Sequence, residues 1–432
     1  MIEASSGAQA RRAPAMPGPE SVPRPPRASD PLARAAGFGF VLFAAAMPIA
    51  MAPMNVAGGL CAALTLAAWL TRPGPPRVRT PLDLPAVVWL AAMGLSTLLA
   101  LDRAASAASL GKGLIPFVTG LAAWHALERR RGAAAVVALL VAGSVVSLIG
   151  WAGFMAAGGR YPARAIGLTG SWMTFGLQLL LLVSLACGIA ITTRGRAWRL
   201  GAAAAAVAGT AGLAASFTRS AWLGLAAALA VQLGLRRPRS LLALALVAAV
   251  LYLALPGDLG DRLRSAFDPA HVTNRERVLM WEAGGRAFRD HPVTGVGLQN
   301  LTALLEGYRS PQAAEHPAHV HNSYLHVALG TGVVGLLAFL ALCVALVVTC
   351  AAGGPDLRRG RGLGAGVRLG VTGGAVGFLL AALFDHAFGD EQLLFLLFTL
   401  AGITYAARGW DDDLPGDIAG SPAATDPGAA AT

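Results

Sequence analysis

The feature that most constrains this chain is a series of long apolar runs separated by short gaps that are rich in arginine. A helix needs about 20 mostly apolar residues to cross a bilayer, and runs of about that length recur along the sequence. Hydrophobic residues make up 55% of the chain and charged residues 13%, whereas a soluble protein carries about a quarter charged residues. The sequence therefore predicts an all-α polytopic membrane protein.

A window of spanning length predicts about twelve transmembrane helices. Most of them precede a long polar segment, and the last three follow it. The predicted spans lie near residues 36–54, 56–71, 84–101, 109–127, 133–156, 173–192, 199–217, 220–235, 239–256, 323–350, 363–384 and 392–407.

Arginine clusters follow every second predicted span, and this alternation predicts the orientation of the helices. Short loops rich in Lys and Arg stay on the cytoplasmic side, so both termini are predicted to be cytoplasmic and the other loops to face outward. The net charge of +11 could indicate a nucleic-acid partner, but clusters confined to short loops do not form one binding face, so none is expected. The clusters are Arg72/Arg77/Arg79, Arg129/Arg130/Arg131, Arg194/Arg196/Arg199, Arg236/Arg237/Arg239 and Arg358/Arg359/Arg361.

The chain divides into five predicted segments. Both ends are rich in Ala and Pro and are predicted to be disordered cytoplasmic tails. The polar segment is predicted to be one large outer loop, in which Val278, Trp281, Gly285 and Phe288 recur at the spacing of an amphipathic surface helix. The segments are a tail at 1–35, spans at 36–256, the loop at 257–322, spans at 323–407 and a tail at 408–432.

His321 stands where the long polar segment meets the next apolar run, and it is the strongest candidate for chemistry. A histidine there needs water or a polar partner, and as a proton acceptor near neutral pH it suits the activation of a hydroxyl group. Gly332 and Gly335 follow at helical spacing and leave room for a second helix or a lipid tail. A structural, hydrogen-bonded histidine is the alternative.

A metal site built on the histidines His316, His319, His321 and His326 is a further alternative. No H-E-x-x-H pattern is present, and Pro317 interrupts the run. The four cysteines all lie in apolar runs, so neither a disulfide framework nor a thiolate metal site is expected. We therefore predict no metal.

Two arginines on the predicted outer face are candidates for binding phosphate oxygens. Arg219 lies in a turn between two apolar runs and is flanked by hydroxyl residues, although it could instead snorkel to lipid headgroups. Arg277 precedes Trp281 by four residues, so a helix would place both on one face. A cation–π contact or a surface ion pair would also explain Arg277, and Arg275 competes with it for a phosphate role.

Other charged residues near the outer ends of predicted spans have more than one possible role. Lys112, Asp385 and His386 could belong to an ion pathway, and Lys112 could equally snorkel. Arg160 and Arg164 could raise the positive potential at the mouth of a cavity or hold lipid headgroups.

The pattern that begins at His321 resembles that of the O-antigen ligase and O-antigen polymerase superfamily. These are bacterial membrane glycosyltransferases that use glycans linked to undecaprenyl diphosphate. The ligase pattern is His, then Asn, Ser or Gln, nine residues, Gly, two residues and a final Gly, Thr or Tyr. His321, Asn322, Gly332 and Gly335 satisfy it without a gap.

Two further stretches carry the resemblance. SFTRSAWLG resembles the family's Ser-x-x-Arg-x-x-Trp turn and places Arg219 at its arginine. RVLMWEAGGRAFRDHPVTGVGLQN resembles the family's R-x-x-x-W and P-x-x-G-x-G segment, which selects Arg277 over Arg275. The three motifs occur in order, and the resemblance is clearest from about residue 160 to 400.

The resemblance implies a ligase that transfers a preassembled glycan from undecaprenyl diphosphate to an acceptor hydroxyl, on lipid A–core or a similar molecule. It also implies no cofactor, metal or ATP, inversion at the anomeric carbon, and a site on the periplasmic face of the bacterial inner membrane. The catalytic residues would be His321, Arg219 and Arg277. The residues predicted to bind substrate are Arg219, Arg277, Arg164, Asn322, Trp281, Gly332 and Gly335.

Other functions remain open at this point. Polymerases of the same superfamily, exopolysaccharide polymerases and protein O-oligosaccharyltransferases share the hydrophobic plan. A transporter could use Lys112, Arg164 and Asp385 as a charge pathway, but no matching pair of interrupted helices indicates inverted repeats. A non-catalytic scaffold would not explain arginines gathered with a histidine on one face.

Overall fold

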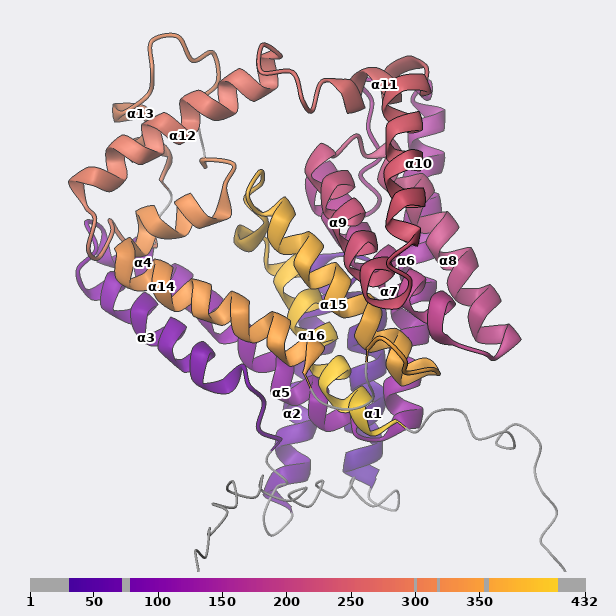
Figure 1. Cartoon of the computed structure of the whole chain (residues 1–432). Helices are drawn as coiled ribbons and strands as arrows, with labels where there is room; N and C mark the ends of the chain where they lie inside the picture. The colour runs from indigo at the N-terminus through magenta and orange to yellow at the C-terminus, as the bar shows by residue number, and fades with distance from the viewer. Residues whose placement is uncertain (1–30, 72–77, 299–300, 317–318, 353–356, 411–432) are drawn as a thin grey trace, which may run out of the picture.

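The structure is a computed structural model that describes residues 31–71, 78–298, 301–316, 319–352 and 357–410 (Figure 1). Within these ranges every regular element is a helix, with sixteen α-helices and three 3-10 helices, which confirms the predicted all-α class. Most of both predicted tails lies outside the described residues. Helix α1 already begins at Pro31, because proline suits the first position of a helix.

Three helices form the buried centre of the molecule, namely α7 (Trp172–Thr192), α15 (Leu363–Ala381) and α16 (Glu391–Ala406). Small residues let α15 approach its neighbours closely, as is common between membrane helices. A Cβ atom at Gly370 would lie 2.6 Å from the Cα of Leu185 on α7. This packing holds the connection between α15 and α16 in a fixed place.

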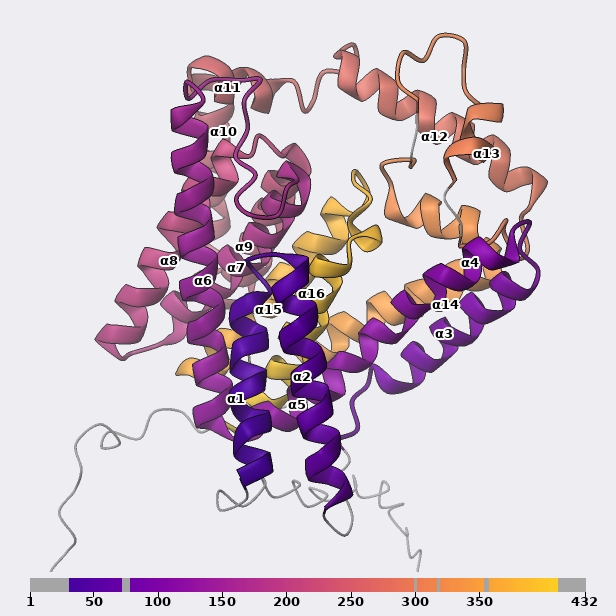
Figure 2. The ribbon, with the colours of Figure 1, turned by 180° about the vertical axis from the view of Figure 1, so that it is seen from behind.

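Helices from the first half of the chain cover one side of this centre. Helices α1 (Pro31–Ala46) and α2 (Met51–Leu70) form a hairpin, and α6 (Arg129–Ala156) packs against α1 (Figure 2). Helix α8 (Arg196–Ala215) packs on both α6 and α7. Helix α9 (Arg219–Arg236) follows it and packs along α15.

A second group of helices lies on the other side of the α15–α16 connection. Helices α3 (Asp83–Leu98) and α14 (Ser323–Ala351) run side by side there (Figure 1). Helix α4 (Arg103–Ser109) and the 3-10 helix η1 (Leu110–Phe117) then lead from α3 towards the centre. The connection between α15 and α16 therefore stands between α9 and α14.

Six helices among the described residues are long and apolar enough to cross a membrane, or seven if a bent pair counts as one span. The bent pair is Ser240–Ala254 and Gly257–Arg264, and the helix direction bends by 112° between them. Helices α1 and α3 are apolar but have only 16 residues each. The predicted span at 109–127 is divided between η1 and α5 (Val118–Ala126). The total of twelve spans therefore stays a prediction.

The described residues of the polar segment at 257–322 form three helices, α11 (Gly257–Arg264), α12 (Val272–Asp290) and α13 (Thr302–Gly307). The expected amphipathic helix is present as α12, but its buried face differs from the predicted one. Val278 is 47% exposed, and the buried positions include Leu279, Met280, Ala283 and Ala287. The offset arises because α12 packs against α14 and α13 rather than lying alone on a surface.

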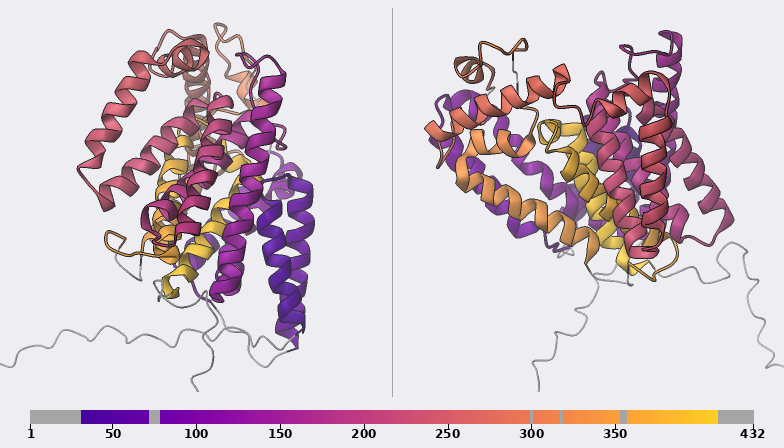
Figure 3. Two further views of the ribbon diagram at one scale, coloured as in Figure 1. Left: turned by 90° about the vertical axis from the view of Figure 1, so that its right-hand side faces the viewer. Right: turned by 45° about the horizontal axis from the view of Figure 1, so that its top comes forward.

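Helix α10 (Ser240–Ala254) is apolar along its whole length and has no buried residue. It lies at the edge of the helix bundle (Figure 3). Helix α10 contacts α9 and α11, but none of its residues is buried between them. An apolar helix with so much exposed surface is stable where lipid surrounds it, so α10 supports the membrane assignment.

Helix α14 is interrupted at Gly332, which has φ 64° and ψ −167°. The interruption frees backbone N–H groups, and that of Val333 donates to the carbonyl oxygen of Pro292 at 2.8 Å. The N–H of Gly297 donates to the carbonyl oxygen of Gly330 at 2.9 Å. The glycine-rich segment at 292–297 is thereby bonded to α14 through its backbone.

Gly332→Ala is expected to destabilise the protein by about 1–3 kcal/mol or more, because alanine is strained at this positive φ. A Cβ there would also lie 2.1 Å from the carbonyl oxygen of Val293. Thermal unfolding in detergent would show a lower Tm. Gly59→Ala is the matched control, since a Cβ on that helical glycine meets nothing within 4 Å. Equal Tm values for the two variants would contradict the role assigned to Gly332.

Candidate functional site

The carboxylate of Asp385, in the connection between α15 and α16, joins three elements of the fold. Its Oδ1 accepts a hydrogen bond from Nη2 of Arg277 at 3.3 Å and lies 3.5 Å from Nδ1 of His321. Its Oδ2 accepts a hydrogen bond from the hydroxyl of Ser220. Asp385 is 1% exposed, so a buried anion ties α9, α12 and the start of α14 together.

Arg277 projects from α12 toward Asp385, and its side chain is 19% exposed. A buried carboxylate is stable only when it is paired and hydrogen-bonded, and Arg277 supplies a permanent positive charge. Arg275 lies two residues earlier on the same helix and is exposed. The contact with Asp385 therefore favours Arg277 over Arg275 as the residue of the site, a choice that helical spacing alone did not make.

His321 directly precedes α14 and has a left-handed backbone with φ 44°. The side chain of Asn322 caps the helix by accepting a hydrogen bond from the N–H of Leu325 at 3.0 Å. Strained backbone of this kind persists only where the surroundings hold it, and it concentrates at functional sites. The Nδ1 atom of His321 faces Asp385, so Nε2 remains for another partner.

The neighbours of Asp385 keep it ionised. Burial alone would raise the pKa of this carboxyl, but His321 at 3.5 Å, the charge of Arg277 and the hydroxyl of Ser220 together lower it. Burial and the nearby His321 lower the pKa of His319 to about 4. At neutral pH this part of the site holds a charged Asp385 beside a neutral His319.

Arg219 is the first residue of α9 and is 6% exposed. The preceding turn contains Phe217 in a left-handed conformation with φ 53°. Nη1 of Arg219 donates to the carbonyl oxygen of Ser265 at 2.8 Å, and Nη2 donates to Oδ1 of Asn274 at 2.8 Å. Arg219 thus fixes the segment that leads from α11 into α12, and its guanidinium still has donors for a ligand because it carries five N–H bonds.

Arg219 and Arg277 line one cavity with a volume of about 300 Å³. Trp281 also lines it, and its buried indole N–H has no hydrogen-bond partner among the described residues. Ligand cavities usually combine apolar walls with a few placed polar groups. Two guanidinium groups at one cavity favour an anionic ligand with several oxygen atoms, such as a phosphate or diphosphate. We refer to this space as the arginine cavity.

Two more arginines lie close to Arg219. The guanidinium groups of Arg164 and Arg262 lie over the ring of Tyr161, at 5.1 and 5.4 Å from its centroid. Burial alone would raise the pKa of Tyr161, but the hydrogen bond from Arg164 and the charges of Arg164, Arg262 and Arg219 lower it. These groups extend the positive potential beyond the arginine cavity and would attract an anionic headgroup.

The structure places the predicted site residues in several different surroundings. Arg219, Arg277 and Trp281 line the arginine cavity, and Asp385 links His321 to Arg277. Arg164 lies in the adjoining basic group, while Asn322 serves as a helix cap. The remaining pair consists of Gly332 and Gly335, which are buried against protein atoms, the backbone of Val293 and the side chain of Thr331.

Three residues of the site were not recognised from the sequence as parts of it, namely Asp385, Ser220 and Arg262. Asp385 is a charge at the end of an apolar run, but it lies 64 positions after His321. Only the packing of α15 beside α9 and α14 brings these residues together. Ser220 follows Arg219 directly, which was the available signal. Arg262 offered none beyond its charge.

No group of three or more His, Cys, Asp or Glu side chains in the described ranges is placed to hold a metal ion. His316 instead pairs with Glu306, with 3.0 Å between Nδ1 and Oε2. The ring of His319 contacts the rings of His321 and His386, and the ring of His326 contacts that of His386.

Asp385→Asn is expected to lower the activity of the site about 10–100-fold, a range seen when the partner that orients a functional histidine is lost. Asparagine keeps the size of the side chain but removes the charge that pairs with Arg277 and faces His321. Because the pKa of Asp385 is lowered, the wild-type ion pair persists through the neutral range and is lost only on acidification. In the wild-type protein the transfer rate should therefore fall at acidic pH as Asp385 becomes protonated. The rate of the variant should not show this fall.

Asp261→Asn is a matched control, since Asp261 is 76% exposed and its ion pair is with Arg264 on the same helix. It should keep the wild-type rate and pH profile. An Asp385→Asn variant that kept both would contradict the central place given to this carboxylate.

A family model described as O-antigen ligase matches residues 204–340. The matched segment extends from α8 to α14 and contains Arg219, Arg277, Trp281 and His321. No significant match to a curated protein was found. The apolar helices and this family both indicate a membrane protein. The match confirms the resemblance carried by the three motifs, and it supports the placement of this chain in the O-antigen ligase and polymerase superfamily.

Proposed function

We propose that the chain is an O-antigen ligase-type glycosyltransferase that moves a preassembled glycan from undecaprenyl diphosphate to an acceptor hydroxyl. The observation that carries this proposal is the link through Asp385 between the arginine cavity and His321. Arg277 lines the cavity and bonds to Asp385, whose same oxygen atom lies 3.5 Å from His321. The carboxylate of Asp385 thereby holds both Arg277, which would bind the leaving diphosphate, and His321, which would accept the proton.

The arginine cavity would receive the diphosphate of the donor. Arg219 and Arg277 would bind its oxygen atoms and stabilise the negative charge that grows as the glycosidic bond breaks. Fixed positive groups stabilise such charge effectively because they need no reorganisation during the reaction. Arg164 and Arg262 would draw the headgroup toward the cavity. The undecaprenyl chain would remain in the bilayer.

His321 would accept the proton of the acceptor hydroxyl at Nε2, since Nδ1 faces Asp385. The acceptor oxygen forms a bond to the anomeric carbon while the bond from that carbon to the diphosphate oxygen breaks. The proton goes to His321, and undecaprenyl diphosphate leaves with the electron pair. A single displacement of this kind inverts the anomeric centre. Asp385 would stabilise the imidazolium that forms.

The orientation in the membrane follows from the same proposal. The arginine clusters at the opposite ends of the helices would be cytoplasmic, which places the site on the periplasmic side of a bacterial inner membrane. Lipid A–core or another hydroxyl-bearing molecule would be the acceptor. The reaction would draw its energy from cleavage of the bond between the glycan and the diphosphate, so no metal, nucleotide or other cofactor would be needed.

The direct test is glycan transfer by the purified protein in lipid nanodiscs, with undecaprenyl-diphosphate glycan as donor and lipid A–core as acceptor. No metal or nucleotide is added. We expect glycosylated acceptor and free undecaprenyl diphosphate in equal amounts, measured by mass spectrometry. A protein that binds neither donor nor acceptor and forms no product with any hydroxyl acceptor would contradict the proposal.

Deletion of the gene separates the ligase from a polymerase of the same superfamily. Loss of a ligase leaves long lipid-linked chains that are not attached to the acceptor. Loss of a polymerase leaves acceptors that carry a single repeat. We expect the first pattern, and the second would move the assignment to a polymerase.

A further inference from the structure

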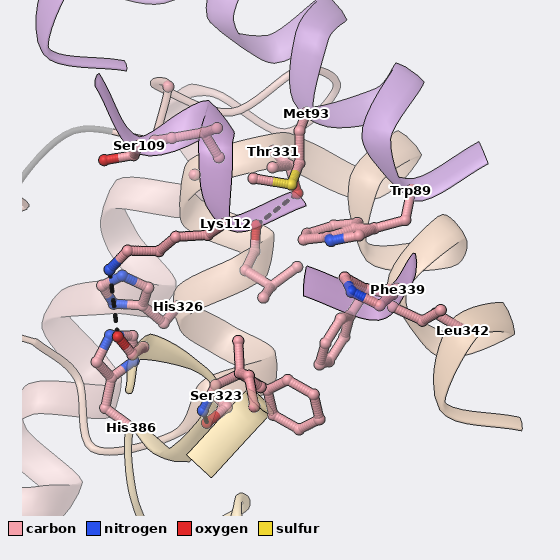
Figure 4. Close-up of a pocket in the computed structure, with 18 of the residues that line it drawn as sticks. Trp89, Met93, Ser109, Lys112, Ser323, His326, Thr331, Phe339, Leu342 and His386 are labelled. Atoms are coloured by element: carbon pink, nitrogen blue, oxygen red, sulfur yellow. Dashed lines mark hydrogen bonds between the residues drawn. The ribbon is translucent and has the colours of Figure 1, made fainter. Parts of the chain in front are cut away.

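A second cavity of about 130 Å³ lies between α3, η1, α14 and the α15–α16 connection (Figure 4). Its lining includes Lys112 of η1, Trp89 of α3 and His326 of α14. None of its lining residues takes part in the arginine cavity. An apolar cavity of about 150 Å³ holds a benzene molecule, so this space suits one six-membered ring or part of one. We refer to it as the Lys112 cavity.

The lining of the Lys112 cavity differs between its two sides. Lys112, His326 and His386 lie on one side, and the rings of Trp89 and Phe339 lie on the other (Figure 4). The centroids of these two rings are 5.5 Å apart. An aromatic wall opposite hydrogen-bonding groups fits a ring that has an apolar face and a polar edge, which describes a sugar ring.

The polar side can form further hydrogen bonds. Lys112 donates to the carbonyl oxygen of Gly389 at 3.2 Å, and an ammonium group has three donors. The Nδ1 atoms of His326 and His386 are buried and have no hydrogen-bond partner among the described residues. Buried polar atoms without partners are uncommon in native proteins and often indicate a missing water or ligand.

The charge of this cavity favours a neutral ligand over an anion. Nζ of Lys112 lies 3.6 Å from Oε1 of Glu391, so its positive charge has a partner within the protein. Among the described residues no arginine lines the cavity, in contrast to the space that holds Arg219 and Arg277. Hydroxyl groups satisfy such donors and acceptors without introducing an unpaired charge.

The Lys112 cavity reaches the candidate site through two residues in its lining. His386 follows Asp385 in the chain, and the hydroxyl of Ser323 donates to the carbonyl oxygen of Asp385 at 2.8 Å. Ser323 is two residues after His321. Asp385 thus links the two cavities, because its carbonyl oxygen bonds to Ser323 of the Lys112 cavity and its carboxylate bonds to Arg277 of the arginine cavity.

We propose that the Lys112 cavity binds an uncharged sugar ring of the glycan acceptor and so positions the acceptor hydroxyl on the side of His321 away from the donor diphosphate. This inference rests on the proposed function. Trp89 stacks on the apolar face of the ring. Lys112 and the histidine pair bind its hydroxyl groups.

Lys112→Met and Trp89→Ala test the inference through steady-state kinetics of glycan transfer. Loss of one hydrogen bond or ring contact to a ligand changes its affinity about tenfold. We therefore expect the KM for the acceptor to rise about tenfold in each variant, with the KM for the donor lipid within about twofold of wild type. The conservative variants Lys112→Arg and Trp89→Phe should recover most of the acceptor affinity.

A control variant and a binding measurement complete the test. Trp151→Ala removes a tryptophan that is 43% exposed on α6 and should leave both KM values unchanged. Saturation-transfer NMR with methyl glucoside and methyl galactoside on the wild-type protein should give signals that Trp89→Ala and Lys112→Met lose. Glycoside binding by a wild-type protein that transfers no glycan would overturn the proposed function and keep the cavity assignment.

Two results would overturn the inference. The first is an unchanged acceptor KM in both Lys112→Met and Trp89→Ala while the wild-type protein transfers glycan. The second is a rise in the donor KM alone, or a loss of affinity that follows Trp89→Ala but not Lys112→Met, because either would indicate a lipid chain in the cavity.

Discussion

His321→Ala is expected to lower kcat for glycan transfer by about 10²–10⁴-fold, the contribution of a well-placed general base. The reason is that Nδ1 faces the ionised Asp385 at 3.5 Å, which leaves Nε2 to accept the hydroxyl proton. The KM for the donor should change little, because the diphosphate is bound by arginines rather than by this ring. Single-turnover kinetics of glycan transfer in nanodiscs measure the rate of the chemical step directly.

His316→Ala is the matched control for this variant. His316 belongs to the same polar segment, is 71% exposed and pairs with Glu306 rather than with Asp385. It should transfer glycan at the wild-type rate. A His321→Ala protein that is folded and equally fast would mean that the acceptor needs no base at this position.

Arg277→Ala is expected to lower kcat by about 10²–10³-fold, the loss recorded when one preorganised donor to a developing anion is removed. Two effects combine in this variant. The arginine cavity loses half of its pair of guanidinium groups, and Asp385 becomes a buried carboxylate without its cationic partner. The affinity for the donor should fall together with kcat in Arg277→Ala, whereas His321→Ala should lower kcat with little change in the KM for the donor.

Arg275→Ala offers a closely matched comparison, because it removes the same charge two residues away on the exposed face of α12. Donor binding, followed by fluorescence of a labelled undecaprenyl diphosphate, should match wild type. Equal losses in the two arginine variants would show that only the overall charge of α12 matters.

Most of the candidate site could be predicted from the sequence because its residues belong to short motifs. Arg219 follows a strained turn and Asn322 caps a helix, and both features depend on residues within a few positions. Asp385 could not be placed in the site because its partners are far away in sequence. A charge at the end of an apolar run is compatible with many roles, and only the packing of α15 selects one.

The fold was predictable in class but less so in detail. Apolar runs indicate helices, but they do not show that Pro116 lies in a 3-10 segment at η1 or that Gly332 interrupts α14. The buried face of α12 was also displaced from the predicted one, because its partners α13 and α14 come from later in the chain. Such features are set by tertiary contacts.

The most direct test of the account is a cryo-EM structure of the wild-type protein with undecaprenyl diphosphate bound. The account predicts that both phosphates lie in the arginine cavity, within hydrogen-bond distance of the guanidinium groups of Arg219 and Arg277. The Nε2 atom of His321 should face the same headgroup. A diphosphate bound away from both arginines, with His321 turned from it, would contradict the account.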